Sequence, residues 1–179
     1  MLIGLLPIGS ADLQVMSRIA DCLENAFPKC KSILLKDPIE VPEESLDITR
    51  QQYDSNTLLE RLHRYSQGRQ IDRILGIADI DLFVPGLNFI FGQAECPGKA
   101  ALISLWRLRS EYYGQSPSDE LLERRSFKEA VHEIGHTFGL RHCPDQYCVM
   151  HFSNSISDTD AKQDLFCSRC FARIHKKAR

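Results

Sequence analysis

The chain has 179 residues, of which 43% are hydrophobic and 26% are charged, and its formal net charge at pH 7 is −2. This length is enough for one domain with a hydrophobic core. The balanced charge excludes a chain-wide field that would recruit nucleic acid or anionic lipid, and no apolar run approaches the roughly 18 residues of a membrane span. We therefore expect no nucleic-acid or membrane partner, and we take a monomer as the default.

The N-terminal stretch "MLIGLLPI" is apolar but short, and no Lys or Arg precedes it. A signal peptide would begin with a basic region, so a buried first strand is the better interpretation. Seven cysteines in a chain without an export signal are typical of a reducing compartment. We therefore expect a cytoplasmic protein.

Strand and helix patterns alternate along the first half of the chain. Apolar residues at helical spacing predict helices over 10–27 and 55–68, and Gly68 would end the second. Each helix starts beside residues that can cap it: Ser10 or Asp12, and Ser55 or Asn56. Apolar runs predict strands over 2–8, 30–39, 72–84, 89–98 and 99–108, with a polar connection over 41–54. This order predicts an α/β fold with a mostly parallel sheet, and the short link between the last two strands favours an antiparallel pair at one edge.

The second half begins with the longest predicted helix, over roughly 119–139. "SFKE" inside it allows a capping box between Ser126 and Glu129, so the helix could restart at Ser126. Beyond Gly139 the pattern is irregular and rich in cysteine. The last stretch, 164–179, predicts a short helix with a basic end that adds solubility rather than binding nucleic acid.

The stretch "HEIGHTFGLRH" contains a candidate metal site. His132 and His136 lie one helical turn apart on one face, so both rings can reach a single ion. Gly139 can end the helix in a left-handed conformation and so bring His142 back as a third ligand. Glu133 is offset around the helix, where a general base can reach a bound water. The alternative is a core helix in which the histidines are coincidental.

The same residues carry a family resemblance. "HEIGHTFGLRH" resembles the metzincin pattern of zinc-dependent peptidases. The spacing C-x4-C-x-M after the third histidine, followed by a distant C-x-x-C, is similar to that of the archaemetzincin family. The resemblance implies that His132, His136 and His142 bind catalytic zinc and that Glu133 is the general base. It also implies that Met150 is the Met-turn residue, which forms an apolar floor under the ligands.

The resemblance also implies a fold and a division of the chain. We expect a compact metzincin-like fold, with a twisted mixed sheet whose antiparallel edge strand borders the cleft. A single metallopeptidase domain would cover 1–179. Its N-terminal subdomain, 1–139, would hold the sheet and the active-site helix, and a small zinc-stapled C-terminal subdomain, 140–179, would hold the Met-turn.

The paired cysteines predict a second, structural zinc. Four thiolates at paired spacing are typical of closed zinc sites, and the members here are Cys143, Cys148, Cys167 and Cys170. Two disulfides or ordinary buried thiols are the alternatives. The remaining cysteines, Cys22, Cys30 and Cys96, lack partners at ligand spacing. We expect Cys22 to be a small buried side chain and Cys96 an exposed turn thiol.

Taken together, these motifs predict a zinc-dependent metallopeptidase with two Zn²⁺ ions, one catalytic and one structural. It would hydrolyse peptide bonds in a peptide or protein substrate by means of a zinc-bound water that Glu133 activates. A zinc hydrolase acting on a non-peptide amide and a non-catalytic zinc-binding interaction protein are the alternatives. An intact Glu133 argues against the second alternative, because a purely structural site needs no base.

Overall fold

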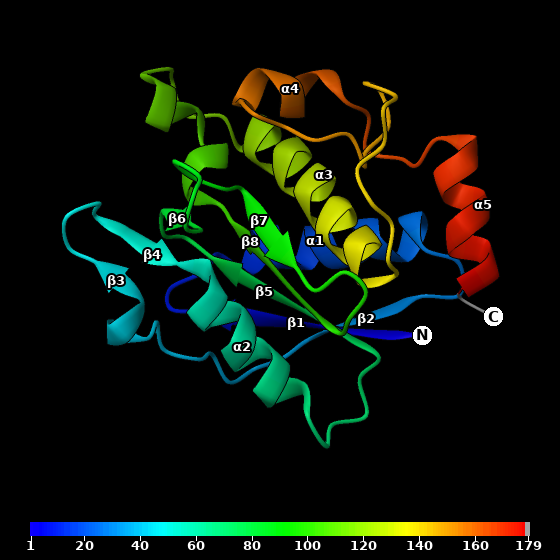
Figure 1. The fold of residues 1–179 in the computed structure, drawn as a ribbon, viewed down its shortest axis with the longest axis horizontal. Helices are drawn as coiled ribbons and strands as arrows, with labels where there is room; N and C mark the ends of the chain where they lie inside the picture. The colour runs from blue at the N-terminus through cyan, green and yellow to red at the C-terminus, as the bar shows by residue number, and fades with distance from the viewer. Residues whose placement is uncertain (178–179) are drawn as a thin grey trace.

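The computed structural model describes residues 1–177, in which helices flank a five-stranded mixed sheet (Figure 1). The strand order is β2-β1-β5-β8-β7, and only β7 runs antiparallel to its neighbour, β8. The bounds are β1 Leu2–Ile8, β2 Lys31–Leu34, β5 Arg73–Ala78, β7 Gly92–Ala94 and β8 Ala100–Ser104. The predicted mixed sheet with an antiparallel edge strand is therefore confirmed. Residues 178–179, at the basic end predicted for the last helix, lie outside the described part.

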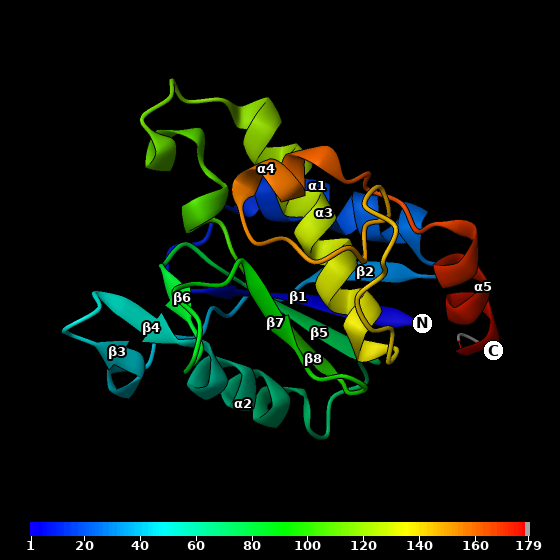
Figure 2. The same cartoon turned by 45° about the horizontal axis from the view of Figure 1, so that its top comes forward.

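Helices pack on both faces of this sheet. α1 (Leu13–Ala26) and α3 (Asp119–Thr137) lie together on one face, and α2 (Ser55–Ser66) lies on the other (Figure 2). Alternate strand residues feed two separate cores, because successive side chains of a strand point to opposite faces. Leu75 and Ile77 join the core under α1 and α3, while Ile74 joins the core under α2.

The helix starts depart from the sequence interpretation in two places. Asp12 caps α1 as expected, with its carboxylate accepting from Gln14 N at 2.8 Å. For α2, Asp54 is the cap rather than Ser55 or Asn56. Helix α3 begins after Ser118 and continues through Ser126, whose hydroxyl donates to Leu122 O at 2.6 Å. Because that hydroxyl is engaged with the preceding turn, it does not form a new cap and the helix does not restart.

A second, smaller sheet corrects the expectation of one strand over 72–84 and a plain connection over 41–54. It consists of β3 (Leu46–Asp47), β4 (Gln52–Asp54) and β6 (Leu82–Phe83). The chain leaves the main sheet at Asp79 and Asp81, whose carboxylates pair with Arg109 and Arg107. These partly buried ion pairs separate two apolar runs that look continuous in the sequence.

The C-terminal region carries two more helices, α4 (Ile156–Ala161) and α5 (Ser168–Lys177). Helix α4 packs against α3, while α5 lies at the end of the molecule near the N-terminus of β1 (Figure 1). Among the described residues, no helix is both long and apolar enough to cross a bilayer.

Candidate active site

The C-terminal half of α3 presents His132 and His136 from one face. The Nδ1 atom of His132 lies 2.7 Å from Val149 O, and that of His136 lies 2.6 Å from Leu140 O. A carbonyl oxygen can only accept a hydrogen bond, so Nδ1 carries the hydrogen in each neutral ring and Nε2 keeps its lone pair. The two Nε2 atoms are 3.0 Å apart. Zinc–nitrogen bonds of roughly 2.0–2.1 Å place tetrahedral donors about 3.3 Å apart, so both rings fit one ion.

The third ring, His142, returns to this pair through a turn at Gly139. Gly139 has φ +75° and donates its N–H to His136 O at 2.7 Å, which ends the helix. The ring of His142 lies 4.9 Å from that of His136 and 5.4 Å from that of His132. One nitrogen from each histidine lies within 4.8 Å of the others. Since burial lowers the pKa of all three rings, they stay neutral and able to bind a metal.

Glu133 lies beside these rings and against the edge strand. It is buried, and a Cβ placed on Gly92 of β7 would come within 2.7 Å of its Oε1 and Cγ atoms. Burial raises its pKa well above the usual range, and the charge of Glu129 adds to this while Lys162 opposes it. Gly92 therefore makes room for the carboxylate. Sequence reasoning missed this role, and the only signal was a glycine within a predicted strand.

A cleft of about 400 Å³ opens onto these groups. One wall is the apolar segment that leads into β7, including Leu87, Phe89 and Phe91, and another includes Phe152. Gly92, Gln93 and Ala94 of β7 also line it, so the antiparallel edge strand borders the cleft. The cleft therefore combines apolar walls with a small set of convergent polar groups, as ligand sites do.

Met150 is fully buried and lies against α3 at Gly135, between His132 and His136 in the chain. A Cβ placed on Gly135 would come within 2.5 Å of Met150 Sδ, so only a glycine lets the helix approach this closely. Ile134, beside it on the helix, is also fully buried. The amide of Cys143 donates to Met150 O at 2.8 Å, which ties the segment after His142 to the same turn.

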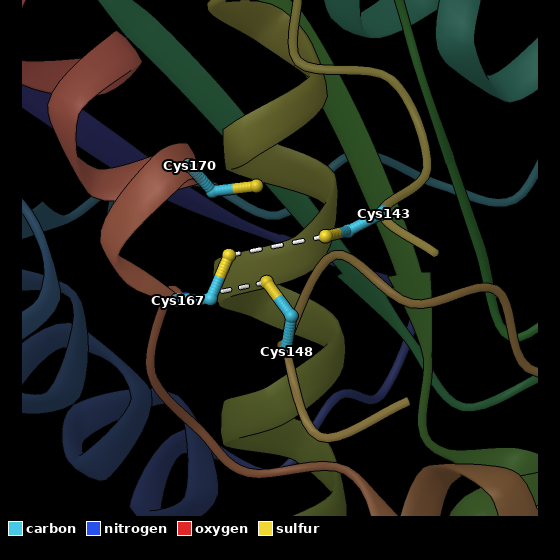
Figure 3. A group of neighbouring side chains, drawn as sticks. All are labelled: Cys143, Cys148, Cys167 and Cys170. Atoms are coloured by element: carbon cyan, nitrogen blue, oxygen red, sulfur yellow. Dashed lines mark hydrogen bonds between the residues drawn. The ribbon is translucent and has the colours of Figure 1, made fainter. Parts of the chain in front are cut away.

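The four paired cysteines form a second cluster, in which all sulfurs point toward one centre (Figure 3). Cys143 Sγ and Cys167 Sγ are 3.8 Å apart. Zinc–sulfur bonds of roughly 2.3 Å in a tetrahedron also give about 3.8 Å between sulfurs. All four are free thiols. Cys143, Cys148 and Cys170 are buried, and Cys167 is half-buried. The alternative of two disulfides is therefore not what the structure shows.

Local hydrogen bonds favour the thiolate form of Cys167, whereas burial raises the pKa of the Cys148 and Cys170 thiols. Burial raises the pKa of the Cys167 thiol, but hydrogen bonds from the backbone of Cys170 and from the neighbouring thiols outweigh it, and the pKa falls to about 7. Arg169 lies against the cysteine cluster, with its Nη2 atom 3.9 Å from Cys143 Sγ. Thiolates are the form that binds metal, so the donors match a soft divalent ion such as zinc.

Sequence reasoning also missed a buried ion pair at the cleft. Lys162 Nζ lies 2.8 Å from Glu129 Oε1, and both side chains are buried. Thr159 Oγ1 donates to the same oxygen at 3.2 Å. Glu129 and Lys162 both line the cleft, one helical turn before Glu133 and just after α4 respectively.

Of the cysteines outside the cluster, Cys96 lies as expected and Cys22 is less buried than expected. Cys96 is exposed in the turn between β7 and β8, and Cys30 is buried. Cys22 is only half-buried, because it sits at the margin of the apolar face of α1; burial there, with the charge of Asp164, raises the pKa of its thiol to about 12. None of them joins a metal-ligand group among the described residues.

Comparisons with known proteins find relatives along nearly the whole chain. The family described as "Peptidase family M54" matches residues 18–176. The archaemetzincin of Pyrococcus furiosus is 39% identical over 98% of this chain and 93% of its own length. The archaemetzincin of Methanocaldococcus jannaschii is 39% identical over 96% of this chain and 91% of its own length.

Two solved structures have the same fold. The crystal structure of archaemetzincin from Methanopyrus kandleri matches with a TM-score of 0.88 and 35% identity, over 99% of this chain and 95% of that one. That of archaemetzincin from Archaeoglobus fulgidus, complexed with malonate, matches with a TM-score of 0.82 and 34% identity, over 97% of this chain and 99% of that one.

Proposed function

Because the chain belongs to peptidase family M54, the archaemetzincins, and is thus a zinc metallopeptidase, we propose that His132, His136 and His142 hold its catalytic zinc and that Glu133 is its general base. The observation that supports this most directly is the convergence of three imidazole nitrogens within 4.8 Å, beside a buried carboxylate, at a cleft. When bound there, zinc supplies a Lewis acid and lowers the pKa of water toward about 7.

Side chains and carbonyl groups of the protein transfer the proton and orient the metal ligands. Glu133 takes a proton from the attacking water and then delivers it to the amine that leaves. Its raised pKa suits this role, since a carboxyl group with an ordinary pKa holds a proton poorly near neutral pH. The carbonyls of Val149 and Leu140 orient the two helical histidines, so that their Nε2 atoms stay directed at one point.

The edge strand supplies a place for the substrate. β7 pairs with β8 on one side only, and its residues line the cleft on the other. An extended peptide can add to such an edge through main-chain hydrogen bonds, which bind a peptide irrespective of its side chains. The substrate is therefore a peptide or protein segment laid along β7, with its scissile bond beside Glu133.

The four cysteines would hold a second, structural zinc. Their sulfur spacing fits a closed tetrahedral site, and Cys143 directly follows His142 in the chain. A closed site at this point fixes the segment that delivers the third histidine. The C-terminal subdomain, 140–179, would then be stapled to the domain by metal, and its reduced thiols suit a cytoplasmic location.

Cleavage profiling tests the proposed chemistry. The zinc-loaded parent and the Glu133→Ala and Glu133→Gln variants are incubated with a peptide library, and new termini are identified by mass spectrometry. We expect cleavage by the parent, with both variants at least about a hundredfold slower and with unchanged zinc content and Tm. Parent-like cleavage by either variant would disprove the base assignment. Turnover of non-peptide amides alone would favour the alternative hydrolase.

A further inference from the structure

The Glu129–Lys162 pair gives the cleft a polar floor that the proposed chemistry does not use. The side chain of Lys162 is fully buried, and Glu129 is almost so. An ammonium group carries three N–H donors. Glu129 Oε1 lies 2.8 Å from Nζ, and no other acceptor among residues 1–177 completes the hydrogen bonding of that group. A buried donor without an acceptor costs free energy. This points to a ligand that supplies a hydrogen-bond acceptor to Lys162 when it binds in the cleft.

A second buried lysine nearby shows what a structural role looks like. Lys128 Nζ donates to Thr159 O and Asp160 O, each at 2.9 Å, and so anchors α4 to α3. Lys128 does not line the cleft, whereas Lys162 does. Lys128 thus contacts α4 and Lys162 directly follows it, but of these two ammonium groups only that of Lys162 is without a hydrogen-bond partner among the described residues.

The surroundings of Lys162 favour an acceptor group in the substrate. Glu129 Oε1 accepts from Thr159 Oγ1 and lies against Lys162, and Lys162 Nζ is the atom of this pair that is buried without a hydrogen-bond partner among the described residues. A cationic side chain would be repelled by Lys162. Lys162 lines the same cleft as His132 and Glu133, so a substrate group that contacts the ammonium lies close to the bond to be cleaved.

We propose that Lys162, held in place by Glu129, is a specificity-determining residue that binds a carboxylate on a substrate residue flanking the scissile bond. Two sources offer this chemistry, an Asp or Glu side chain and the C-terminal carboxylate of a peptide. The apolar walls at Phe89 and Phe91 would hold the carbon stem, and the ammonium would receive the charged end. The inference rests on the proposed function, because it assigns the substrate class of the same cleft.

Binding of small blocked probes to the zinc-loaded protein tests this without turnover. Acetyl-Glu-amide is compared with acetyl-Gln-amide for the side-chain source, and acetyl-Leu with acetyl-Leu-amide for the terminal source, by NMR titration. We expect at least one carboxylate probe to bind about tenfold or more tighter than its amide partner. The pair that shows the preference identifies the source. No preference in either pair, or tighter binding of acetyl-Lys-amide than of both carboxylates, would overturn the proposal.

Variants assign the preference to Lys162 rather than to the zinc. The double variant Glu129→Gln/Lys162→Met replaces the pair with neutral side chains of similar size, so that no lone charge stays buried. It should lose the preference for carboxylate and keep its affinity for acetyl-Leu-amide. Lys128→Met, the matched control, should keep the preference. A preference that survives in the double variant would contradict the proposal. If the double variant does not fold, the same probes on His136→Ala, which should lack the catalytic zinc, decide: loss of the preference there would assign it to the zinc and contradict the proposal.

The outcome is separable from that of the proposed peptidase chemistry. If the parent cleaves no peptide but still prefers carboxylates through Lys162, the peptidase mechanism fails and the binding site stands. If the parent cleaves peptides with equal rates for Glu, Gln and Leu beside the scissile bond and shows no preference among the probes, the mechanism stands and the site fails.

Discussion

The histidine cluster and the cysteine cluster are built from different kinds of chain. Two of the three histidines stand on a regular helix, α3, and only His142 comes from irregular chain. Of the four cysteines, only Cys170 lies within a helix, at the start of α5. The histidine cluster ranges from buried His132 to exposed His142, while in the cysteine cluster only Cys167 is half-buried and the other three side chains are buried. A rigid helix can hold ligands from one side and leave the other open to substrate, whereas irregular chain needs the ion itself to fix its position.

The largest effect that separates the two clusters is expected for His136→Ala. The variant should lose one zinc of two and roughly 10³-fold or more in peptide turnover, because it removes a ligand of the metal that polarises the substrate. Its Tm should change by only a few degrees, since α3 is held by packing. Metal analysis and thermal unfolding measure both quantities. His175→Ala, on α5, is the control, and retention of both zincs by His136→Ala would contradict the ligand assignment.

Cys170→Ser should lower the thermal stability more than it lowers peptide turnover, which is the reverse of what is expected for His136→Ala. Loss of a structural zinc should lower the free energy of unfolding by roughly 3 kcal/mol or more, which is a fall in Tm of about 10 °C. Zinc content and thermal unfolding are the measurements, with Cys96→Ser in the exposed turn as the control. An unchanged Tm with two zincs bound would remove the distinction between a catalytic and a structural site.

Gly92→Ala tests whether the edge strand β7 fixes the position of the Glu133 carboxylate beside the histidine cluster. The added Cβ would lie 2.7 Å from Glu133 Oε1 and from Leu102 O, so the carboxylate must move. We expect turnover to fall by roughly tenfold to a hundredfold with zinc content unchanged, because small displacements of a catalytic group are costly. Gly4→Ala in β1, where an added Cβ meets only side-chain atoms at 3.0 Å or more, is the control. Parent-like rates for Gly92→Ala would mean that Glu133 is not held by this contact.

The smallest expected effect lies outside both clusters. It is the pH-dependent contribution of Glu95 to the stability of the fold. Glu95 Oε2 accepts from Lys99 N at 2.6 Å and from Ala100 N at 3.0 Å in the turn between β7 and β8. Burial raises the pKa of Glu95, but these hydrogen bonds and His63 outweigh it, so the pKa lies below its usual range. The carboxylate therefore contributes stability above the unfolded pKa of about 4.5 and loses it as pH falls through the lower folded pKa.

Glu95→Gln should accordingly destabilise the protein by about 1 kcal/mol at pH 7. The difference from the parent should shrink as the pH falls below about 4. Urea unfolding at both pH values measures it. A difference that grows toward acid pH would show that the carboxylate is not the stabilising form.

Local spacing in the sequence predicted most of the fold and the membership of both clusters. The i, i+4 histidines, the turn at Gly139 and the paired cysteines are all short-range patterns, and the structure brings each set together. The break in the predicted strand 72–84 was missed, because Asp79 and Asp81 find their partners in arginines from a later segment.

Long-range contacts account for what was missed at the cleft. Gly92 opposite Glu133, and Lys162 against Glu129, join residues on different elements, and neither pair has a spacing that a single sequence displays. The N-cap of α2 was predicted one or two residues late, because Asp54, Ser55 and Asn56 are all good N-cap residues. Which groups share a pocket is therefore decided by how the elements pack, not by periodicity.

The packing of Met150 against Gly135 limits which sequences can carry this zinc motif. In H-E-x-x-H the two middle positions are usually written as free. In this fold the first is Ile134, fully buried, and the second is a glycine whose missing side chain leaves room for a sulfur 2.5 Å from where a Cβ would lie. A search or design that keeps only the two histidines and the glutamate would accept variants in which the helix is pushed off its support, so both middle letters belong in the motif.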